Sequence, residues 1–154
     1  MNCQRSKRHL LSAALAAIVA AALPGAGQAA DPPKSIKIGY SISLTGPYAP
    51  GAGSTAIGNY QLWVKDVNDA GGIMLSKFNK KVPIEVVTYD DKSSLEDAVR
   101  NTERLMLSDK VDFVLPPWGT ATHMAVGPLY ERHGYPLMAY TSAAERSLEL
   151  RARW

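Results

Sequence analysis

Residues 36–54, IKIGYSISLTGPYAPGAGS, decide the fold because they join a strand pattern to a glycine-rich loop. Apolar side chains alternate with small or polar residues at Ile36, Ile38, Tyr40 and Ile42, which is the two-residue period of a β-strand. A helical pattern follows the loop. A strand, a glycine-rich turn and a helix in this order indicate an α/β protein, and in many such proteins the turn holds a phosphate.

The same alternation of strand and helix patterns continues through the remaining sequence. Further strands are predicted at residues 82–91, 111–116 and 135–140. Strands that alternate with helices predict a Rossmann-like parallel sheet with helices on both faces. The predicted helices run from an N-cap at Ser54 or Thr55 to Gly71, from a capping box at Ser93–Glu96 or Ser94–Asp97 to about Lys110, from about Thr120 to Arg132, and from Ser142 onward.

Ligands of parallel α/β sheets bind beyond the carboxyl ends of the strands. Four loops are predicted at that edge, and the loop that follows the first strand is one of them. Its position therefore indicates a binding site before its composition is considered. The four loops are residues 43–54, 90–93, 116–120 and 140–144.

The glycine spacing argues against a nucleotide in this loop. Gly46, Gly51, Gly53 and Gly58 do not give the G-x-G-x-x-G spacing, and no lysine follows them as in a phosphate loop. A nucleotide-dependent α/β enzyme is therefore the least favoured interpretation. No serine lies in a G-x-S-x-G elbow. We expect neither catalysis nor a cofactor.

Two histidines and two aspartates were the other candidates for chemistry. His123 and His133 are ten residues apart, a spacing that resembles no zinc motif, and we interpret both as structural or solvated. Asp90 and Asp91 at a strand end could coordinate a cation, but such carboxylates more often cap a turn. We favour capping and expect no metal.

Hydroxyl groups and aromatic rings remain as the candidate site. Thr120 and Ser142 each lie just before a predicted helix, whose first amides have no partner within the helix. Two such ends can hold a carboxylate without a lysine or arginine. Tyr48, Trp118 and Tyr140 would form the walls of the pocket. The alternative is that both hydroxyls only cap helices and that the aromatic rings belong to the core.

The N-terminus has the pattern of an export signal. Three basic residues precede a 14-residue apolar run from Leu10 to Leu23, too short for the roughly 18–20 residues that span a bilayer, and small residues follow. We expect residues 1–30 to be a signal peptide, cleaved near Ala29 or Ala30, and the mature protein to be periplasmic. An uncleaved membrane anchor is the alternative.

Cleavage would change the charge of the protein. The 17 basic and 14 acidic residues become 14 of each, and Cys3 is also removed with the leader. A mature chain without net charge or a polybasic segment gives no indication of a nucleic-acid partner. At the other end, SLELRARW (147–154) ends the sequence within a helical pattern, so we expect residues 31–154 to be a truncated part of a longer protein.

Three short stretches make the sequence resemble a known family. The loop TGP (45–47), the helix end NDAGGI (68–73) and the strand end YDD (89–91) occur in this order. With the sequence around them, from about Ile36 to Leu148, they resemble the N-terminal lobe of type I periplasmic binding proteins. The resemblance is closest to the leucine/isoleucine/valine-binding proteins that serve ABC importers. It implies an exported, non-catalytic protein that binds an amino acid or related small organic acid or amide and delivers it to a membrane permease. The same fold also serves as the extracellular domain of sensory receptors, which is the alternative function.

The resemblance also implies which residues contact the ligand. In that family the first of two lobes holds the ligand's α-carboxylate through hydroxyls and backbone amides, and the second lobe, which this chain lacks, binds the ammonium group. Matched position by position, the hydroxyl after the third strand corresponds to Thr120. A ligand contact two residues earlier corresponds to Trp118. The small-residue segment after the fourth strand corresponds to Ser142, Ala143 and Ala144. Ala144 replaces a common threonine, which leaves open whether the ligand is a branched-chain amino acid or an aromatic carboxylate or amide.

Overall fold

The computed structural model describes residues 31–143. The predicted signal peptide, Ala144 and most of the helix predicted from Ser142 lie outside the described residues. Three parallel strands form the main sheet in the order β4-β1-β5. Strand β1 (Ile36–Ile42) is central and pairs along its whole length with β4 (Ile84–Asp90), while β5 (Phe113–Val114) pairs with Ile38 and Gly39 on the other side. The predicted parallel sheet is confirmed.

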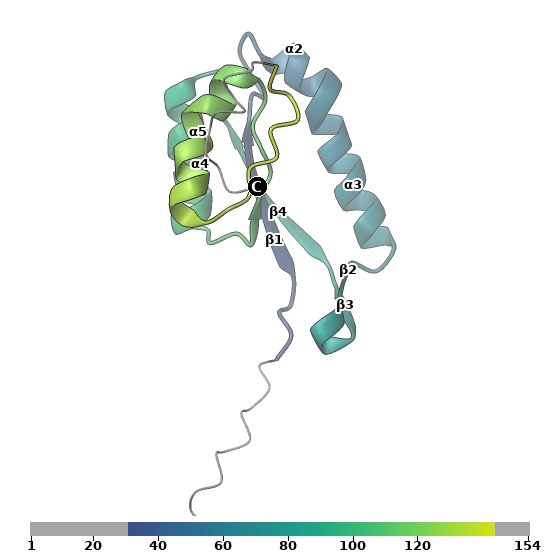
Figure 1. The fold of residues 1–154 in the computed structure, drawn as a ribbon. Helices are drawn as coiled ribbons and strands as arrows, with labels where there is room; N and C mark the ends of the chain where they lie inside the picture. Colours follow the sequence, from purple (N-terminus) through teal and green to yellow (C-terminus); the bar gives the residue numbers. More distant parts are fainter. Residues whose placement is uncertain (1–30, 144–154) are drawn as a thin grey trace, which may run out of the picture. The chain divides into compact units, whose positions relative to one another are not determined.

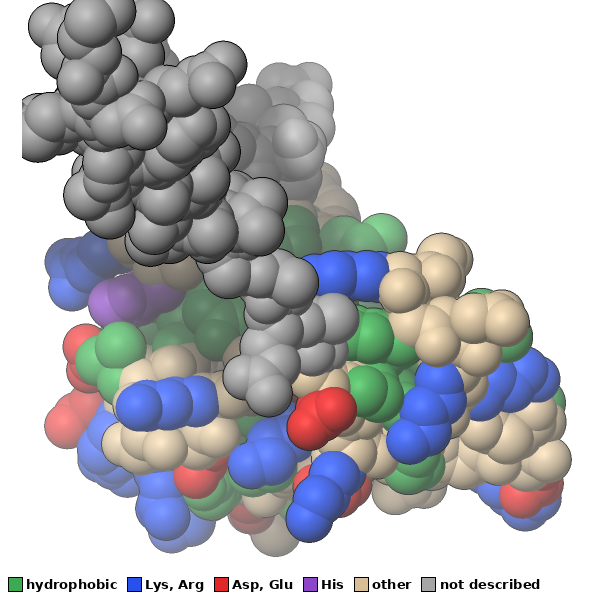
Figure 2. Space-filling view, turned by 90° about the horizontal axis from the view of Figure 1, so that it is seen from below, with side chains coloured by type: hydrophobic (Ala, Val, Ile, Leu, Met, Phe, Trp, Pro, Cys, Tyr) green, Lys and Arg blue, Asp and Glu red, His purple; other side chains and the backbone are tan. Residues whose placement is uncertain are grey.

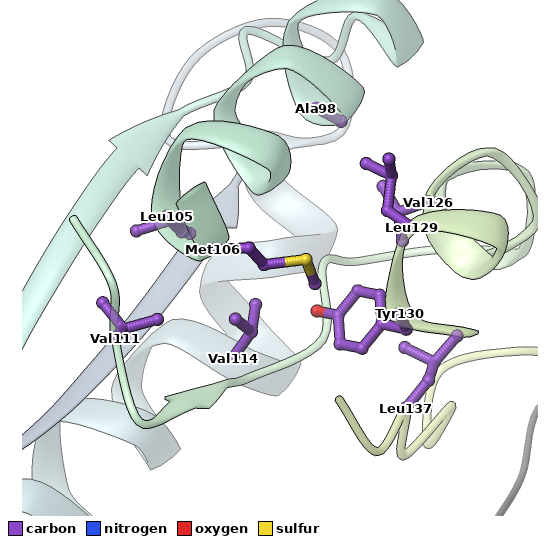
Figure 3. Close-up of a cluster of buried hydrophobic side chains, with 9 residues drawn as sticks. All are labelled: Ala98, Leu105, Met106, Val111, Val114, Val126, Leu129, Tyr130 and Leu137. Atoms are coloured by element: carbon purple, nitrogen blue, oxygen red, sulfur yellow. The ribbon is translucent and has the colours of Figure 1, made fainter. Parts of the chain in front are cut away.

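Helices cover both faces of this sheet, as predicted. Helix α3 (Gly58–Asp69) lies on one face, and α4 (Leu95–Leu107) and α5 (Thr120–His133) lie together on the other (Figure 1). The core on the side of α4 and α5 is a cluster of nine buried side chains (Figure 3). They are Ala98, Leu105, Met106, Val111, Val114, Val126, Leu129, Tyr130 and Leu137.

Helix α4 begins at the second of the two predicted capping boxes. Ser94 is the N-cap, and its hydroxyl accepts a hydrogen bond from the amide of Asp97 at 3.3 Å. The preceding residue, Ser93, does not cap the helix. Its backbone lies in the left-handed region with φ of 61°. Two adjacent serines therefore take different positions at the end of β4.

The first helix begins six or seven residues earlier than predicted, with its N-cap at Tyr48. A short helix α2 (Ala49–Ala52) continues through a π-helical turn, η1 (Gly53–Ile57), into α3. The hydroxyls of Ser54 and Thr55 do not cap a helix; both donate to the carbonyl of Gly51 within it, at 3.1 and 2.8 Å. Pro50 in the first turn suits a helix start because proline lacks the amide that would have no partner there. The helix ends as predicted, with Gly71 in a left-handed conformation at φ of 91°.

A β-hairpin that the sequence did not predict follows this helix. Strand β2 (Ile73–Leu75) and strand β3 (Lys80–Val82) pair antiparallel and enclose a 3₁₀ turn, η2 (Ser76–Phe78). Both strands have only three residues, and Asn79 makes the turn between them with φ of 47°. Strands this short carry too little alternation for the sequence pattern to reveal them.

The strand predicted at residues 135–140 is wrong. This segment has no ladder partner in the part of the chain that the structure describes, and Pro136 has no amide to donate to one. The Tyr135 amide donates instead to the carbonyl of Tyr130 at the end of α5. Leu137 is buried, whereas Met138 is 73% exposed. The strand predicted at 111–116 is confirmed only over the two residues of β5.

The surface of residues 31–143 is mixed in character. Figure 2 shows Lys and Arg side chains interspersed with acidic, polar and apolar ones on the face that it presents. Within the described range, no helix combines the length and the apolar character needed to cross a membrane.

Candidate functional site

The loops at the carboxyl edge of the sheet are joined by carboxylates. Asp90, the last residue of β4, accepts hydrogen bonds from the amides of Leu44 and Thr45 and, at 2.6 Å, from the Thr45 hydroxyl. Burial would raise the pKa of Asp90, but the bonds from Thr45, Lys92 and Leu44 outweigh it and hold the pKa below its ordinary value. Asp90 therefore fastens the loop after β1 to the turn after β4, which is the capping role that we favoured.

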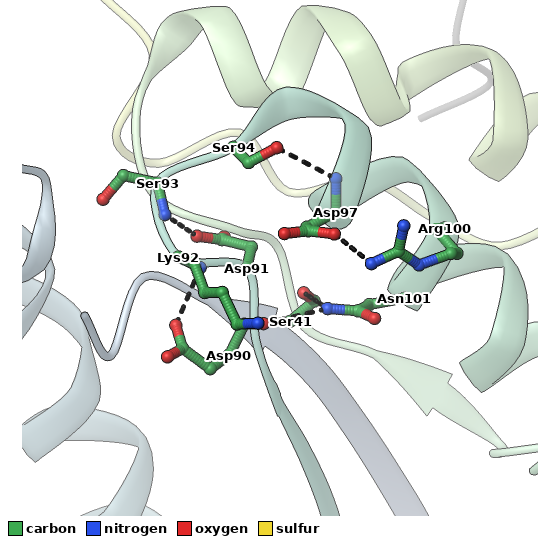
Figure 4. A network of polar contacts seen from close by, with 9 residues as sticks. All are labelled: Ser41, Asp90, Asp91, Lys92, Ser93, Ser94, Asp97, Arg100 and Asn101. Carbon is green, nitrogen blue, oxygen red and sulfur yellow. Dashed lines mark hydrogen bonds and ion pairs between the residues drawn. The ribbon is translucent and has the colours of Figure 1, made fainter. Parts of the chain in front are cut away.

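Asp91 makes the second connection of this kind. It is 1% exposed and accepts from the Ser43 hydroxyl at 2.6 Å. It also accepts from the Ser93 amide at 2.9 Å (Figure 4). Burial raises the pKa of Asp91, and these two hydrogen bonds oppose the rise. No group of three or more potential metal ligands is found among the described residues. Both aspartates thus act in the structure as hydrogen-bond acceptors for turns.

A pocket of about 240 Å³ lies beside these loops. It is at the N-terminus of α5, between the loops that follow β1 and β5. Since β1 has β4 on one side and β5 on the other, this is the point where the strand order reverses, the usual ligand position in such sheets. Its lining residues are Tyr48, Trp118, Gly119, Thr120, Ala121, Thr122 and Thr141.

Two aromatic rings form one wall of the pocket. The ring centroids of Tyr48 and Trp118 are 5.7 Å apart, with an angle of 46° between the planes. The Trp118 indole donates to the Thr55 hydroxyl at 2.9 Å, which fixes the orientation of its ring. Trp118 also packs against a buried cluster that includes Ile42 and Ala52, so it belongs both to the core and to the pocket. Tyr48 is 38% exposed.

Of the three threonines that line the pocket, Thr120 and Thr141 have hydroxyl oxygens that accept a hydrogen bond from a backbone amide. Thr120 Oγ1 accepts from the Ala143 amide at 3.0 Å, and Thr141 Oγ1 accepts from the Gly119 amide at 3.1 Å. A hydroxyl has one proton and two acceptor positions, so these bonds leave both protons for other acceptors. Thr120 is the first residue of α5, whereas Gly119 occupies the N-cap without a side-chain cap. The hydroxyl of Thr120 is therefore not used for capping.

The N-terminus of α5 adds backbone donors. Within residues 31–143, the first amide of α5 with a backbone acceptor is that of His123, which donates to the Gly119 carbonyl at 3.1 Å. The amides of Thr120, Ala121 and Thr122 precede it, and these three residues line the pocket. Helix N-termini favour negative charge through such amides and the helix dipole. The lining residues themselves carry no charged side chain.

The other predicted site residues lie around the pocket. The Tyr140 ring is 6.0 Å from the Tyr60 ring, outside the lining, and is half exposed. The Ser142 hydroxyl is buried and has no hydrogen-bond partner among the described residues. Ala143 contributes its amide to Thr120. The ligand contacts of all these residues stay predictions. Thr141 was missed, although its hydroxyl lies in one of the four loops that the sequence placed at this edge.

His123 is a structural residue. It is fully buried, and its Nδ1 lies 2.7 Å from the Gly119 carbonyl oxygen. Burial lowers the pKa of His123, although the bond to Gly119 opposes the shift. The imidazole is therefore held neutral, with the Nδ1 proton donated to Gly119. His133 is the last residue of α5.

In parallel α/β sheets, a small pocket at the point where the strand order reverses is the usual place for a small ligand. Comparison with known proteins identifies the family. Residues 35–152 match the family described as periplasmic binding protein, so the chain belongs to this family. The expected type I lobe is confirmed.

Solved structures of relatives agree with this assignment. The branched-chain amino acid transporter substrate-binding protein LivJ of Streptococcus pneumoniae, in complex with isoleucine, is 29% identical, with a TM-score of 0.66 over 75% of this chain and 31% of LivJ. A periplasmic binding protein type 1 from Bordetella pertussis is 30% identical, with a TM-score of 0.56 over 68% of this chain and 26% of that protein.

A third structure shares the fold at lower identity. It is a solute-binding protein of an ABC transporter from Rhodopseudomonas palustris, in complex with 3,4-dihydroxybenzoic acid. The TM-score is 0.63 at 21% identity, over 77% of this chain and 30% of that protein. The chain thus spans less than a third of the length of each of these three relatives.

Proposed function

We propose that this chain is the N-terminal ligand-binding lobe of an exported solute-binding protein, which delivers a small organic carboxylate, such as an amino acid or an aromatic acid, to the permease of an ABC importer. The observation that carries the proposal is the pocket at the N-terminus of α5. It is lined by the first residues of the helix and by Thr120 and Thr141, whose hydroxyl protons remain to be donated, and its lining residues carry no charged side chain. The function is binding and not catalysis.

The chemistry of the pocket favours a carboxylate. Thr120 and Thr141 each have one proton to donate, and the helix end adds amides and a partial positive charge. A carboxylate accepts several hydrogen bonds, so it matches a lining that offers several donors and no charged acceptor. An ammonium group would find no carboxylate in this lining and would need one from another part of the protein.

The walls of the pocket are suited to a flat or bulky apolar group. Tyr48 and Trp118 present aromatic rings, which pack well against aromatic or branched side chains. The ligands named for two of the relatives, isoleucine and 3,4-dihydroxybenzoic acid, are both carboxylates, one aliphatic and one aromatic. This agreement supports a carboxylate and leaves both classes as candidates.

A single lobe should bind weakly. Ligand sites of this kind usually cover most of the ligand surface, and two-domain binding proteins achieve this by closing around it. The chain covers 31% of LivJ, so the remaining two thirds of such a protein would supply the opposite wall.

The test is a titration of the ¹⁵N-labelled protein followed by NMR, which detects weak binding. We expect benzoate or isoleucine at millimolar concentration to shift the amide resonances of Thr120, Ala121 and Thr141. ATP and NAD, added at the same concentration, should leave them unchanged, since the loop after β1 lacks phosphate-loop spacing. Shifts caused by ATP or NAD alone would refute the proposal.

A further inference from the structure

We infer that Ser93 is a positioning residue for the binding pocket: its hydroxyl holds the loop that carries Tyr48 in place, although Ser93 does not line the pocket itself. The inference rests on the proposed function of the pocket. It assigns a binding role to Ser93, which the sequence analysis considered only as a helix cap.

The hydroxyl of Ser93 is bonded twice to the loop after β1. It accepts from the Tyr48 amide at 2.9 Å and donates to the Thr45 carbonyl at 3.0 Å. These partners are 45 and 48 residues away in the sequence, and they lie at the two ends of the same short turn. One side chain thus closes the turn from 45 to 48 and ties it to the end of β4.

The fit between this turn and Ser93 is close. A Cβ on Gly46 would lie 2.6 Å from the Ser93 hydroxyl oxygen and 2.7 Å from the Lys92 carbonyl oxygen. Only glycine allows this approach, and Gly46 also has φ of 87°, which other residues rarely adopt. The turn is therefore shaped around the Ser93 hydroxyl.

The backbone at Ser93 is strained in a way that aims this hydroxyl. Lys92 and Ser93 both lie in the left-handed region, at φ of 53° and 61°. Their amides are held by the side chains of Asp90 and Asp91, at 2.8 and 2.9 Å. Figure 4 shows the Ser93 hydroxyl directed away from α4, while the adjacent Ser94 points to α4 and caps it. Strained residues held by their surroundings are common where a functional site must be preorganised.

The connection from Ser93 to the pocket passes through Tyr48. Tyr48 is the N-cap of α2, and its ring lines the pocket against Trp118. The Tyr48 side chain makes no capping hydrogen bond to α2. The hydrogen bond from the Tyr48 amide to the Ser93 hydroxyl is therefore the side-chain contact that fixes the backbone of Tyr48. Loss of the bond should release the Tyr48 ring from the pocket wall.

The structure offers a matched pair of variants for the test. Ser93→Gly removes the hydroxyl and relieves the left-handed strain. Lys92→Gly relieves the same strain at the neighbouring position, where the exposed lysine side chain makes no hydrogen bond with the described residues. Each variant relieves one left-handed residue, but only Ser93→Gly removes a group that is bonded to the loop carrying Tyr48, so a difference between them at Tyr48 reports on that bond.

The first measurement needs no ligand. Hydrogen exchange of the Tyr48 amide, followed by NMR, should accelerate on the order of tenfold in Ser93→Gly, because that amide loses its acceptor. Exchange should stay as in the wild type in Lys92→Gly. Equal exchange rates in the two variants would overturn the inference.

The second measurement is binding. In Ser93→Gly the apparent affinity for benzoate should fall severalfold, and the ratio of benzoate to isoleucine affinity should change, because an aromatic wall is released. A merely structural role would lower the melting temperature and leave this ratio unchanged, and that result would refute the positioning role. If the wild type binds neither acid, the proposed function fails, and the exchange rate of Tyr48 alone decides the role of Ser93.

Discussion

The Trp118 ring lies directly over Gly51, so closely that a Cβ at position 51 would be 2.4 Å from the nearest ring carbon. Gly51 belongs to α2, and Trp118 belongs to the loop after β5, so this contact sets the distance between two loops at the ligand edge. Gly51 thus allows the close approach of Trp118, as Gly46 allows that of Ser93.

Gly51→Ala should therefore displace Trp118 and reshape the pocket. No heavy atom can approach a Cβ at 2.4 Å, so the ring must move and the bond from its indole to Thr55 should break. We expect a changed indole N–H resonance and loss of benzoate or isoleucine binding. An unchanged indole resonance would show that the ring tolerates the methyl group.

Gly53→Ala is the matched control for this change. Gly53 has a helical φ of −62°, and a Cβ there would meet nothing within 4 Å. The substitution should stabilise the protein by up to about 1 kcal/mol, because alanine is the better helix former. Binding should be unaffected. The free energy of unfolding in urea and the same titration test both points, and a destabilised Gly53→Ala would contradict the geometry.

Thr120→Ala should weaken carboxylate binding by about 1–3 kcal/mol, because it removes a donor to a charged acceptor. It also leaves the Ala143 amide without its acceptor. Thr88→Ala makes the same chemical change on the exposed face of β4 and should leave the affinity unchanged. Equal affinities of the two variants, measured by NMR titration, would remove Thr120 from the site.

Much of the fold could be predicted because local signals agree with tertiary structure there. The alternation from Ile36 to Ile42, the cap at Ser94 and the glycine after α3 each specify one element by themselves. The start of the first helix could not be predicted in this way. Gly51 and Gly53 give the segment the composition of a loop. Gly51 is required because the ring of Trp118, 67 positions later in the sequence, packs against it.

The site could be predicted in part for a related reason. Strand ends and helix starts locate Thr120 and Trp118, because these positions follow from the order of the elements. Thr141 was missed because its position depends on a bond to Gly119 and not on a helix start. The role of Ser93 was missed because its partners, Tyr48 and Thr45, come from another loop.

The leader should be removed on export. The short apolar run and the small residues after it lead us to expect a mature N-terminus at Ala30 or Asp31. N-terminal sequencing of protein recovered from the periplasm tests this expectation. Full-length chain in the membrane fraction would instead support an uncleaved anchor.

His123 should make the stability of the protein depend on pH. Its pKa in the folded protein is lowered from the ordinary value of 6.5, mainly by burial, so the unfolded chain binds a proton more readily than the folded one. The stability that the neutral imidazole contributes is present above pH 6.5 and is lost as the pH falls through the lowered pKa. A protonated ring would also bury an Nε2 proton that has no acceptor among the described residues.

The test compares urea unfolding of the wild type and His123→Asn between about pH 7 and pH 5, the window in which the unfolded histidine becomes charged. Asparagine cannot titrate, and its amide is placed to donate near the position of Nδ1. Because a buried ring is lost, the variant should be less stable at pH 7 by about 1–3 kcal/mol. Its free energy of unfolding should, however, change less with pH than that of the wild type. Parallel pH curves for the two proteins would show that His123 titrates normally in the folded state, in conflict with its burial.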